Sequence, residues 1–111
     1  MAKALDNLVV ARQLKAEPSS PDEIDTLLKR AAGLLADAAN ATLGSPSRFS
    51  LAYDAAFALA TAALRLSGYR ADVARGHRAV VFQALPHTLA APAELWTALS
   101  AAHDRRNAAQ I

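Results

Sequence analysis

The chain has 111 residues, a length that fits one domain with a hydrophobic core of its own. It contains no cysteine, which excludes disulfide frameworks, thiolate catalysis and zinc sites built on sulfur. Hydrophobic residues make up 53% of the sequence and aromatic residues 5%, and a formal net charge of +2 permits a phosphate-bearing partner without requiring one.

The first residues do not have the pattern of a secretory signal peptide, because Lys3 is followed by the acidic Asp6 and not by an apolar stretch. The segment that comes nearest to a membrane span is 51–64, and Asp54 interrupts it. We therefore expect a cytoplasmic protein that does not enter a membrane. The helical pattern runs to Ile111 without a stop signal, so either the natural protein continues or its last turn frays.

Five helical segments are predicted, and strand-like alternation is absent from the sequence. The first runs from Ala4 to Lys15 and ends before a segment rich in proline and serine. The second begins near Pro21, because Ser20 and Glu23 have the spacing of a capping box around that proline. Its apolar side chains form one stripe: Ile24, Leu27, Leu28, Ala31, Leu34, Leu35 and Ala38. This helix is expected to pack on one side only.

The third helix is predicted from Arg48 to Ser67, with Gly68 at its C-terminal end. It is apolar nearly all round, apart from a narrow polar strip that includes Asp54 and Arg65. A helix of this kind is buried on several sides. Either the other helices surround it, or a second copy of the chain covers part of it.

The fourth helix is predicted from Val73 to Thr88, with Pro86 ending or kinking it, and the fifth from Pro92 to the end of the chain. Short connections favour antiparallel neighbours. We therefore predict an all-α fold over residues 1–111, a single domain in which four main helices form an up-and-down bundle with a shorter N-terminal helix.

The last turn of the fifth helix carries the densest group of ionisable residues. His103 and Arg106 continue the apolar face on which Trp96 and Leu99 lie, so this face is expected to point inward. A buried guanidinium cannot be neutralised, and it needs a carboxylate, a phosphate or water to meet it. We therefore expect a cleft at this turn. Trp96 is interpreted as a core or dimer anchor.

Several segments, in this order, resemble the HEPN superfamily (higher eukaryotes and prokaryotes nucleotide-binding). They are Tyr53-Asp54-Ala55-Ala56, Gly68-Tyr69-Arg70, Gly76-His77-Arg78-Ala79-Val80 and Arg106-Asn107. The resemblance covers about residues 24–107, and it implies a helical bundle that works as a homodimer. In members that cleave RNA, an arginine is followed four to six residues later by a histidine that acts as acid or base.

Arg106 and Asn107 match the start of that motif, but residues 108–111 supply no histidine. The resemblance therefore implies a non-catalytic module associated with a nucleotide or RNA, and a small nucleotidyltransferase as its partner in a toxin–antitoxin-like system. One alternative is a divergent, dimeric HEPN ribonuclease toxin, in which the histidine lies beyond Ile111 or is replaced by His103. Another is a purely structural dimer.

The candidate catalytic pair is His103 with Arg106. The candidate phosphate-binding residues are Arg70, Arg75, His77, Arg78, Arg106 and Asn107. Those from 70 to 78 lie around the start of the fourth helix, where backbone donors favour phosphate. The structural alternatives are a core histidine at position 77 and a solvated, salt-bridged helix end at 104–106. The histidine spacings predict no metal site, and no cofactor is predicted.

Overall fold

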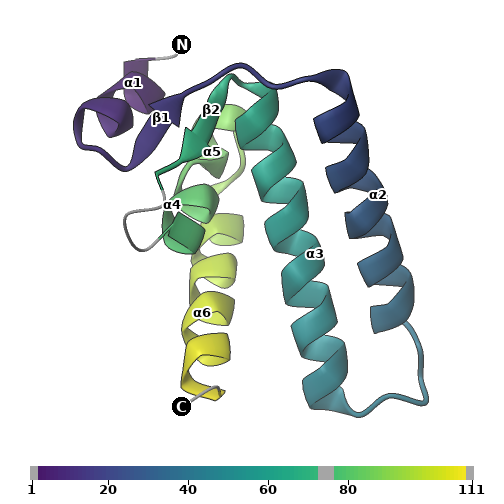
Figure 1. The fold of residues 1–111 in the computed structure, drawn as a ribbon. Coiled ribbons are helices and arrows are strands. Elements are labelled where there is room, and N and C mark those ends of the chain that lie inside the picture. Colours follow the sequence, from purple (N-terminus) through teal and green to yellow (C-terminus); the bar gives the residue numbers. More distant parts are fainter. Residues whose placement is uncertain (1–2, 73–76, 110–111) are drawn as a thin grey trace.

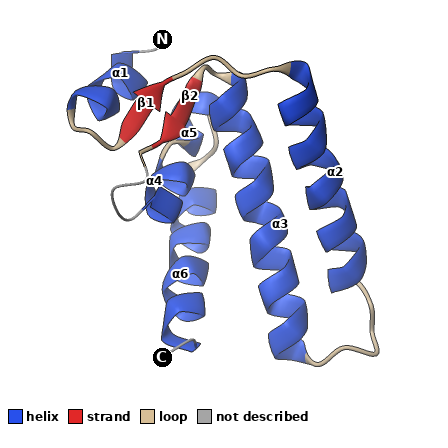
Figure 2. Cartoon of the chain, in the orientation of Figure 1, coloured by secondary structure: helices blue, strands red, loops and turns tan. Residues whose placement is uncertain are grey.

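The computed structural model describes residues 3–72 and 77–109. In chain order its elements are α1 (Lys3–Val10), β1 (Leu14–Ala16), α2 (Pro21–Ala38), α3 (Ser45–Leu66), β2 (Tyr69–Ala71), α4 (His77–Gln83), α5 (Leu85–Thr88) and α6 (Ala93–Ala109). Helices dominate, and the two short strands pair with each other (Figure 2). The predicted all-α class is confirmed.

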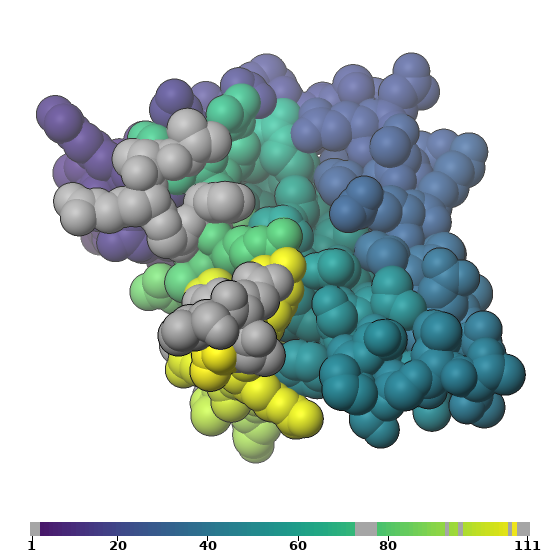
Figure 3. All heavy atoms as spheres, turned by 60° about the horizontal axis from the view of Figure 1, so that its bottom comes forward, coloured from purple at the N-terminus to yellow at the C-terminus, as the bar shows by residue number. Residues whose placement is uncertain are grey.

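The long helices α2, α3 and α6 run side by side in alternating directions, with α3 in the middle (Figure 1). Seen from the end at which α6 terminates, α6 lies against one flank of α3 and α2 lies on the other (Figure 3). The short α4 and α5 lie between the strands and α6, and both contact α3. The main core cluster forms on this side of α3, where Phe82, Leu64, Val81 and Leu85 are among the buried residues.

The start of α2 follows the predicted capping box. The backbone N–H of Glu23 donates to the hydroxyl of Ser20 over 3.2 Å, and Pro21 occupies the first turn. The apolar stripe of α2 packs on α3, as predicted for a helix that packs on one side only. The stripe is only partly covered. Leu28 and Leu35 remain 47% and 49% exposed.

The first helix is shorter than predicted, and the expectation of no strand was wrong. The helix α1 ends at Val10, and Arg12 adopts a left-handed φ of 62° that no helix continues through. Residues 14–16 then pair antiparallel with 69–71, with Lys15 opposite Arg70. Strands of three residues are too short to show the alternation of apolar and polar residues by which a strand is recognised in a sequence. Their pairing depends on residues more than fifty positions away.

The turn into β2 follows the predicted C-terminal glycine. After the cap residue Ser67, Gly68 adopts a φ of 93°, a conformation that side chains disfavour. The predicted fourth helix is interrupted at Ala84, and Pro86 lies in the first turn of α5. The beginning of that predicted helix, residues 73–76, lies outside the described residues.

Among the described helices, α3 alone is long and apolar enough to cross a membrane by length and composition. It nevertheless carries Asp54 and Arg65, whose charges meet partners inside the fold. It is also flanked by helices on two sides. Its packing is that of the core helix of a bundle.

Arg65 joins the end of α3 to the segment before α2. Its side chain is buried, with 6% of the residue exposed. The guanidinium donates two hydrogen bonds to the carboxylate of Glu23 and lies 3.1 Å from the carboxylate of Glu17. It also donates to the carbonyls of Glu17, Pro18 and Tyr69 over 3.0, 3.1 and 3.2 Å. One side chain therefore fixes the linker, the first turn of α2 and the start of β2.

Replacing Arg65 is expected to destabilise the fold strongly. Arg65→Ala leaves two carboxylates and three carbonyls without this donor, and the free energy of unfolding should fall by about 3 kcal/mol. Urea denaturation measures the change. Lys29→Ala, which removes an exposed pair with Asp25, is the matched control and should cost at most about 0.5 kcal/mol. Equal losses in the two variants would contradict the role assigned to Arg65.

The same cluster predicts a dependence of stability on pH. Hydrogen bonding to the Arg65 guanidinium holds the pKa of Glu23 below its ordinary value. A lowered pKa in the folded state means that the stabilisation is present above the ordinary pKa of glutamate and is lost as the pH falls through the lowered value. Thermal unfolding followed from neutral to acidic pH should show this decline. In Glu23→Gln the decline should be smaller, and an unchanged pH profile would contradict the assignment.

Candidate functional site

Three helices bring charged side chains together at one place, which we call the Asp54 cluster: Asp54 from α3, Arg78 from α4 and Arg106 from α6. Nη1 of Arg78 lies 3.8 Å from Oδ1 of Asp54, and Nη2 of Arg106 lies 3.9 Å from the same oxygen. One carboxylate thus faces two guanidinium groups. The cluster carries an excess positive charge of one, which favours an anion.

Aromatic rings hold both guanidinium groups in position. The Cζ atom of Arg78 lies 4.2 Å from the centre of the Phe57 ring and 5.7 Å from that of Tyr53. On α6, the Cζ atom of Arg106 lies 5.1 Å from the Tyr53 ring centre. Attraction between a cation and an aromatic ring orients a guanidinium without using its N–H groups. Those donors therefore stay available for another acceptor.

The Asp54 cluster is not closed by hydrogen bonds. Separations of 3.8 and 3.9 Å exceed hydrogen-bond length, so the attraction is purely electrostatic. Within the described part of the chain, three buried atoms of the cluster have no hydrogen-bond partner: Oδ1 of Asp54, Nη1 of Arg78 and Nε of Arg106. The side chains of Arg78 and Arg106 are 30% and 20% exposed, so part of each side chain, though not these buried atoms, is open to solvent. Unsatisfied buried donors of this kind are uncommon and mark a candidate binding site.

His103 lies one turn before Arg106 and is tied to the same aromatic ring. Its Nδ1 and the hydroxyl of Tyr53 are 2.9 Å apart, in a hydrogen bond whose direction depends on the histidine tautomer. The two rings stack with their planes 28° apart. This contact fixes the orientation of the imidazole beside the two cations.

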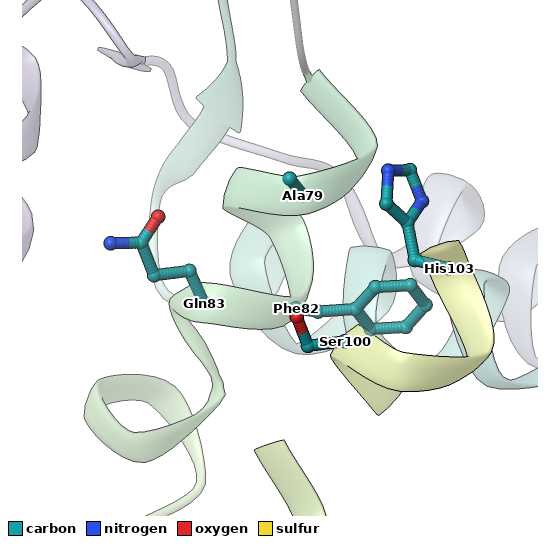
Figure 4. Close-up of a pocket in the computed structure, with 5 residues that line it drawn as sticks. All are labelled: Ala79, Phe82, Gln83, Ser100 and His103. Atoms are coloured by element: carbon teal, nitrogen blue, oxygen red, sulfur yellow. The ribbon is translucent and has the colours of Figure 1, made fainter. Parts of the chain in front are cut away.

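The imidazole also borders a pocket of about 220 Å³ between α4 and α6. Its lining residues are Ala79, Phe82, Gln83, Ser100 and His103. Figure 4 shows the side chains of His103 on α6 and Phe82 on α4 at this pocket, while the amide of Gln83 extends away from both. Within the described residues, no group of three or more histidine, aspartate and glutamate side chains could hold a metal ion.

The structure brings three of the candidate residues together, His103, Arg106 and Arg78. Arg70 is placed elsewhere: it lies on β2, where its Nη1 is 3.4 Å from a carboxylate oxygen of Glu17. It therefore belongs to the Arg65 network. Arg75 lies outside the described residues, as do the side chains of His77, Trp96 and Asn107.

Sequence reasoning did not assign a site role to Asp54, Tyr53 or Phe57. A signal for Asp54 was available, because a single carboxylate on a helix that is apolar nearly all round requires a cationic partner. The aromatic residues gave no such signal. Rings at this spacing on α3 are equally well explained by core packing, and only the fold shows that guanidinium groups lie over them.

The hydrogen bond between Tyr53 and His103 can be tested by removing one oxygen atom. Tyr53→Phe keeps the ring that supports both arginines, so we expect a loss of about 1 kcal/mol in stability and a change in the NMR shifts of the His103 ring protons. Tyr69→Phe is the control, because it removes a hydroxyl that donates to Asp6 at the other end of α3. If Tyr69→Phe moves the His103 signals as much, the contact is not what orients the imidazole.

No protein-family model, no curated protein and no solved structure matches this chain. A function for this chain is therefore inferred from the geometry of the Asp54 cluster and from the sequence motifs that resemble those of HEPN proteins.

Proposed function

We propose that the chain is a non-catalytic, HEPN-like module that binds a phosphate group of a nucleotide or of RNA at the Asp54 cluster. The observation that carries this proposal is the convergence of two half-buried guanidinium groups, each with a buried N–H nitrogen that lacks an acceptor among the described residues. Guanidinium groups donate to phosphate oxygens in a fixed, planar geometry.

Asp54 affects the two arginines differently with and without a bound phosphate. Without a ligand, its carboxylate offsets the repulsion between Arg78 and Arg106, which would otherwise face each other in a partly buried place. When a phosphate binds, its oxygens accept from the two arginines, and the nearby carboxylate repels it. Asp54 therefore keeps the site assembled and limits its affinity for anions.

The proposal predicts a sharp difference between neighbouring arginines. Arg106→Gln and Arg78→Gln should each weaken the binding of AMP or a short RNA about tenfold, since each removes charge-assisted hydrogen bonds. Arg105→Gln is the matched control: its guanidinium lies 4.5 Å over the Phe49 ring and outside the cluster. Asp54→Asn should raise the affinity. Isothermal calorimetry at two salt concentrations measures all four variants.

An equal effect of Arg105→Gln and Arg106→Gln would show only unspecific attraction to a basic surface. If the natural chain binds no phosphate-bearing ligand, the proposal is wrong, and a purely structural role becomes the better explanation of the cluster.

A ribonuclease is the second candidate, favoured by the position of His103. Its imidazole is held by Tyr53 in the same group of side chains as the two cations. An oriented imidazole can move a proton while guanidinium groups stabilise the charge on a phosphate. Cleavage of a fluorescent RNA by the natural chain, and its loss in both His103→Ala and Arg106→Ala, would support this activity. Inactivity of the natural chain would leave the binding module.

We also propose a homodimer as the working assembly. The support is the partly covered stripe of α2, where Leu28 and Leu35 are exposed two turns apart and the small Ala32 between them allows a close approach. Light scattering on the purified protein tests this. A cytoplasmic location and a nucleotidyltransferase partner, in a toxin–antitoxin-like pair, remain proposals based on the sequence and its resemblance.

A further inference from the structure

The Asp54 cluster opens into a groove between α2 and α3, with a volume of about 220 Å³. We call it the α2–α3 groove. Asp54 and Arg78 belong to both the cluster and the groove, and Arg30 contributes a further guanidinium from α2. Leu27, Phe57 and Ala58 provide apolar walls.

Arg30 differs from its neighbour on the same helix. The ammonium group of Lys29 lies 2.9 Å from the carboxylate of Asp25, one turn away. Arg30 is exposed and forms no ion pair with any residue that the structure describes. Lys29 is thus neutralised by an ion pair with Asp25, while Arg30, in the lining of the groove, has no such partner among the described residues.

Counted together, the cluster and the groove place three guanidinium groups near one carboxylate. In the proposed function, Arg78 and Arg106 bind one phosphate, because their guanidinium groups converge on the same oxygen of Asp54. Arg30 reaches the groove from the other helix, and it forms no ion pair with Asp54, the carboxylate that also lines the groove. The walls are apolar apart from Thr61, whose hydroxyl already donates to the carbonyl of Phe57.

We infer that Arg30 binds a second phosphate of the same ligand, so that the site takes two phosphates joined by a short linker. This inference rests on the proposed function. The ligand is either the pyrophosphate group of a nucleoside diphosphate or two consecutive phosphates of an RNA strand. Both present the same chemistry, negative oxygens at two neighbouring positions, to arginines on two different helices.

Three probes separate these sources in one calorimetric series: AMP, ADP and the 5′-phosphorylated dinucleotide of adenosine. Arg30→Gln should weaken the binding of a ligand with two phosphates about tenfold and leave the affinity for AMP unchanged. A loss with ADP identifies a pyrophosphate, and a loss with the dinucleotide identifies an RNA backbone. Lys29→Gln removes the same charge one residue away and should change neither affinity.

The inference is overturned if Arg30→Gln binds all three probes as the natural chain does, or if it weakens AMP as much as the others. In the latter case Arg30 acts only through its overall charge. Neither result touches the proposed function so long as Arg106→Gln still weakens AMP. Failure of the natural chain to bind any of the probes would remove the proposed function and this inference together. Circular dichroism confirms that the exposed substitutions leave the fold intact.

Discussion

The fold depends on one buried guanidinium. Arg65 lies near the end of a helix that is otherwise apolar on most sides, and its charge cannot be removed by deprotonation. The surrounding chain must therefore bring acceptors to it, and it does so with the linker before α2, with Glu23 in the first turn of α2, and with the first residue of β2. Since α2 begins at this contact, Arg65 fixes where the first turn of α2 lies against α3.

The two charged clusters on α3 differ in how their buried polar groups are satisfied. Around Arg65, carboxylates and carbonyls take up the donors at hydrogen-bond distance. Around Asp54, the arginines stop at nearly 4 Å, and buried donors are left over. Sequences that fold well satisfy their buried polar groups, so an unsatisfied group is evidence of another task. The contrast within one helix is the strongest reason for proposing a binding site at Asp54, near the middle of α3.

Periodicity and capping residues were sufficient to predict the long helices. Ser20, Pro21 and Glu23 gave the start of α2, and Gly68 gave the end of α3, because both signals are local. The strands could not be predicted, since Leu14 has no partner until Tyr69 to Ala71 lie beside it. The same limit applies to the site. The inward-facing helix stripe indicated His103 and Arg106, and the basic patch at the start of the fourth helix indicated Arg78. The convergence of these residues on Asp54 from three helices is a property of the fold. Arg70 was predicted to bind phosphate because it is close in sequence to Arg75, His77 and Arg78, but in the fold it forms an ion pair with Glu17.

The pairing of β1 with β2 also determines the order in which parts of this chain can become structured. The hairpin of α2 and α3 is built from neighbouring segments, and its formation closes only a short loop. The strand β1 must wait until β2 exists, and β2 follows α3 in the chain. During synthesis, β1 therefore leaves the ribosome before β2 and can pair with it only after the central helix has been made. A strand that is made early in the chain therefore completes its pairing late.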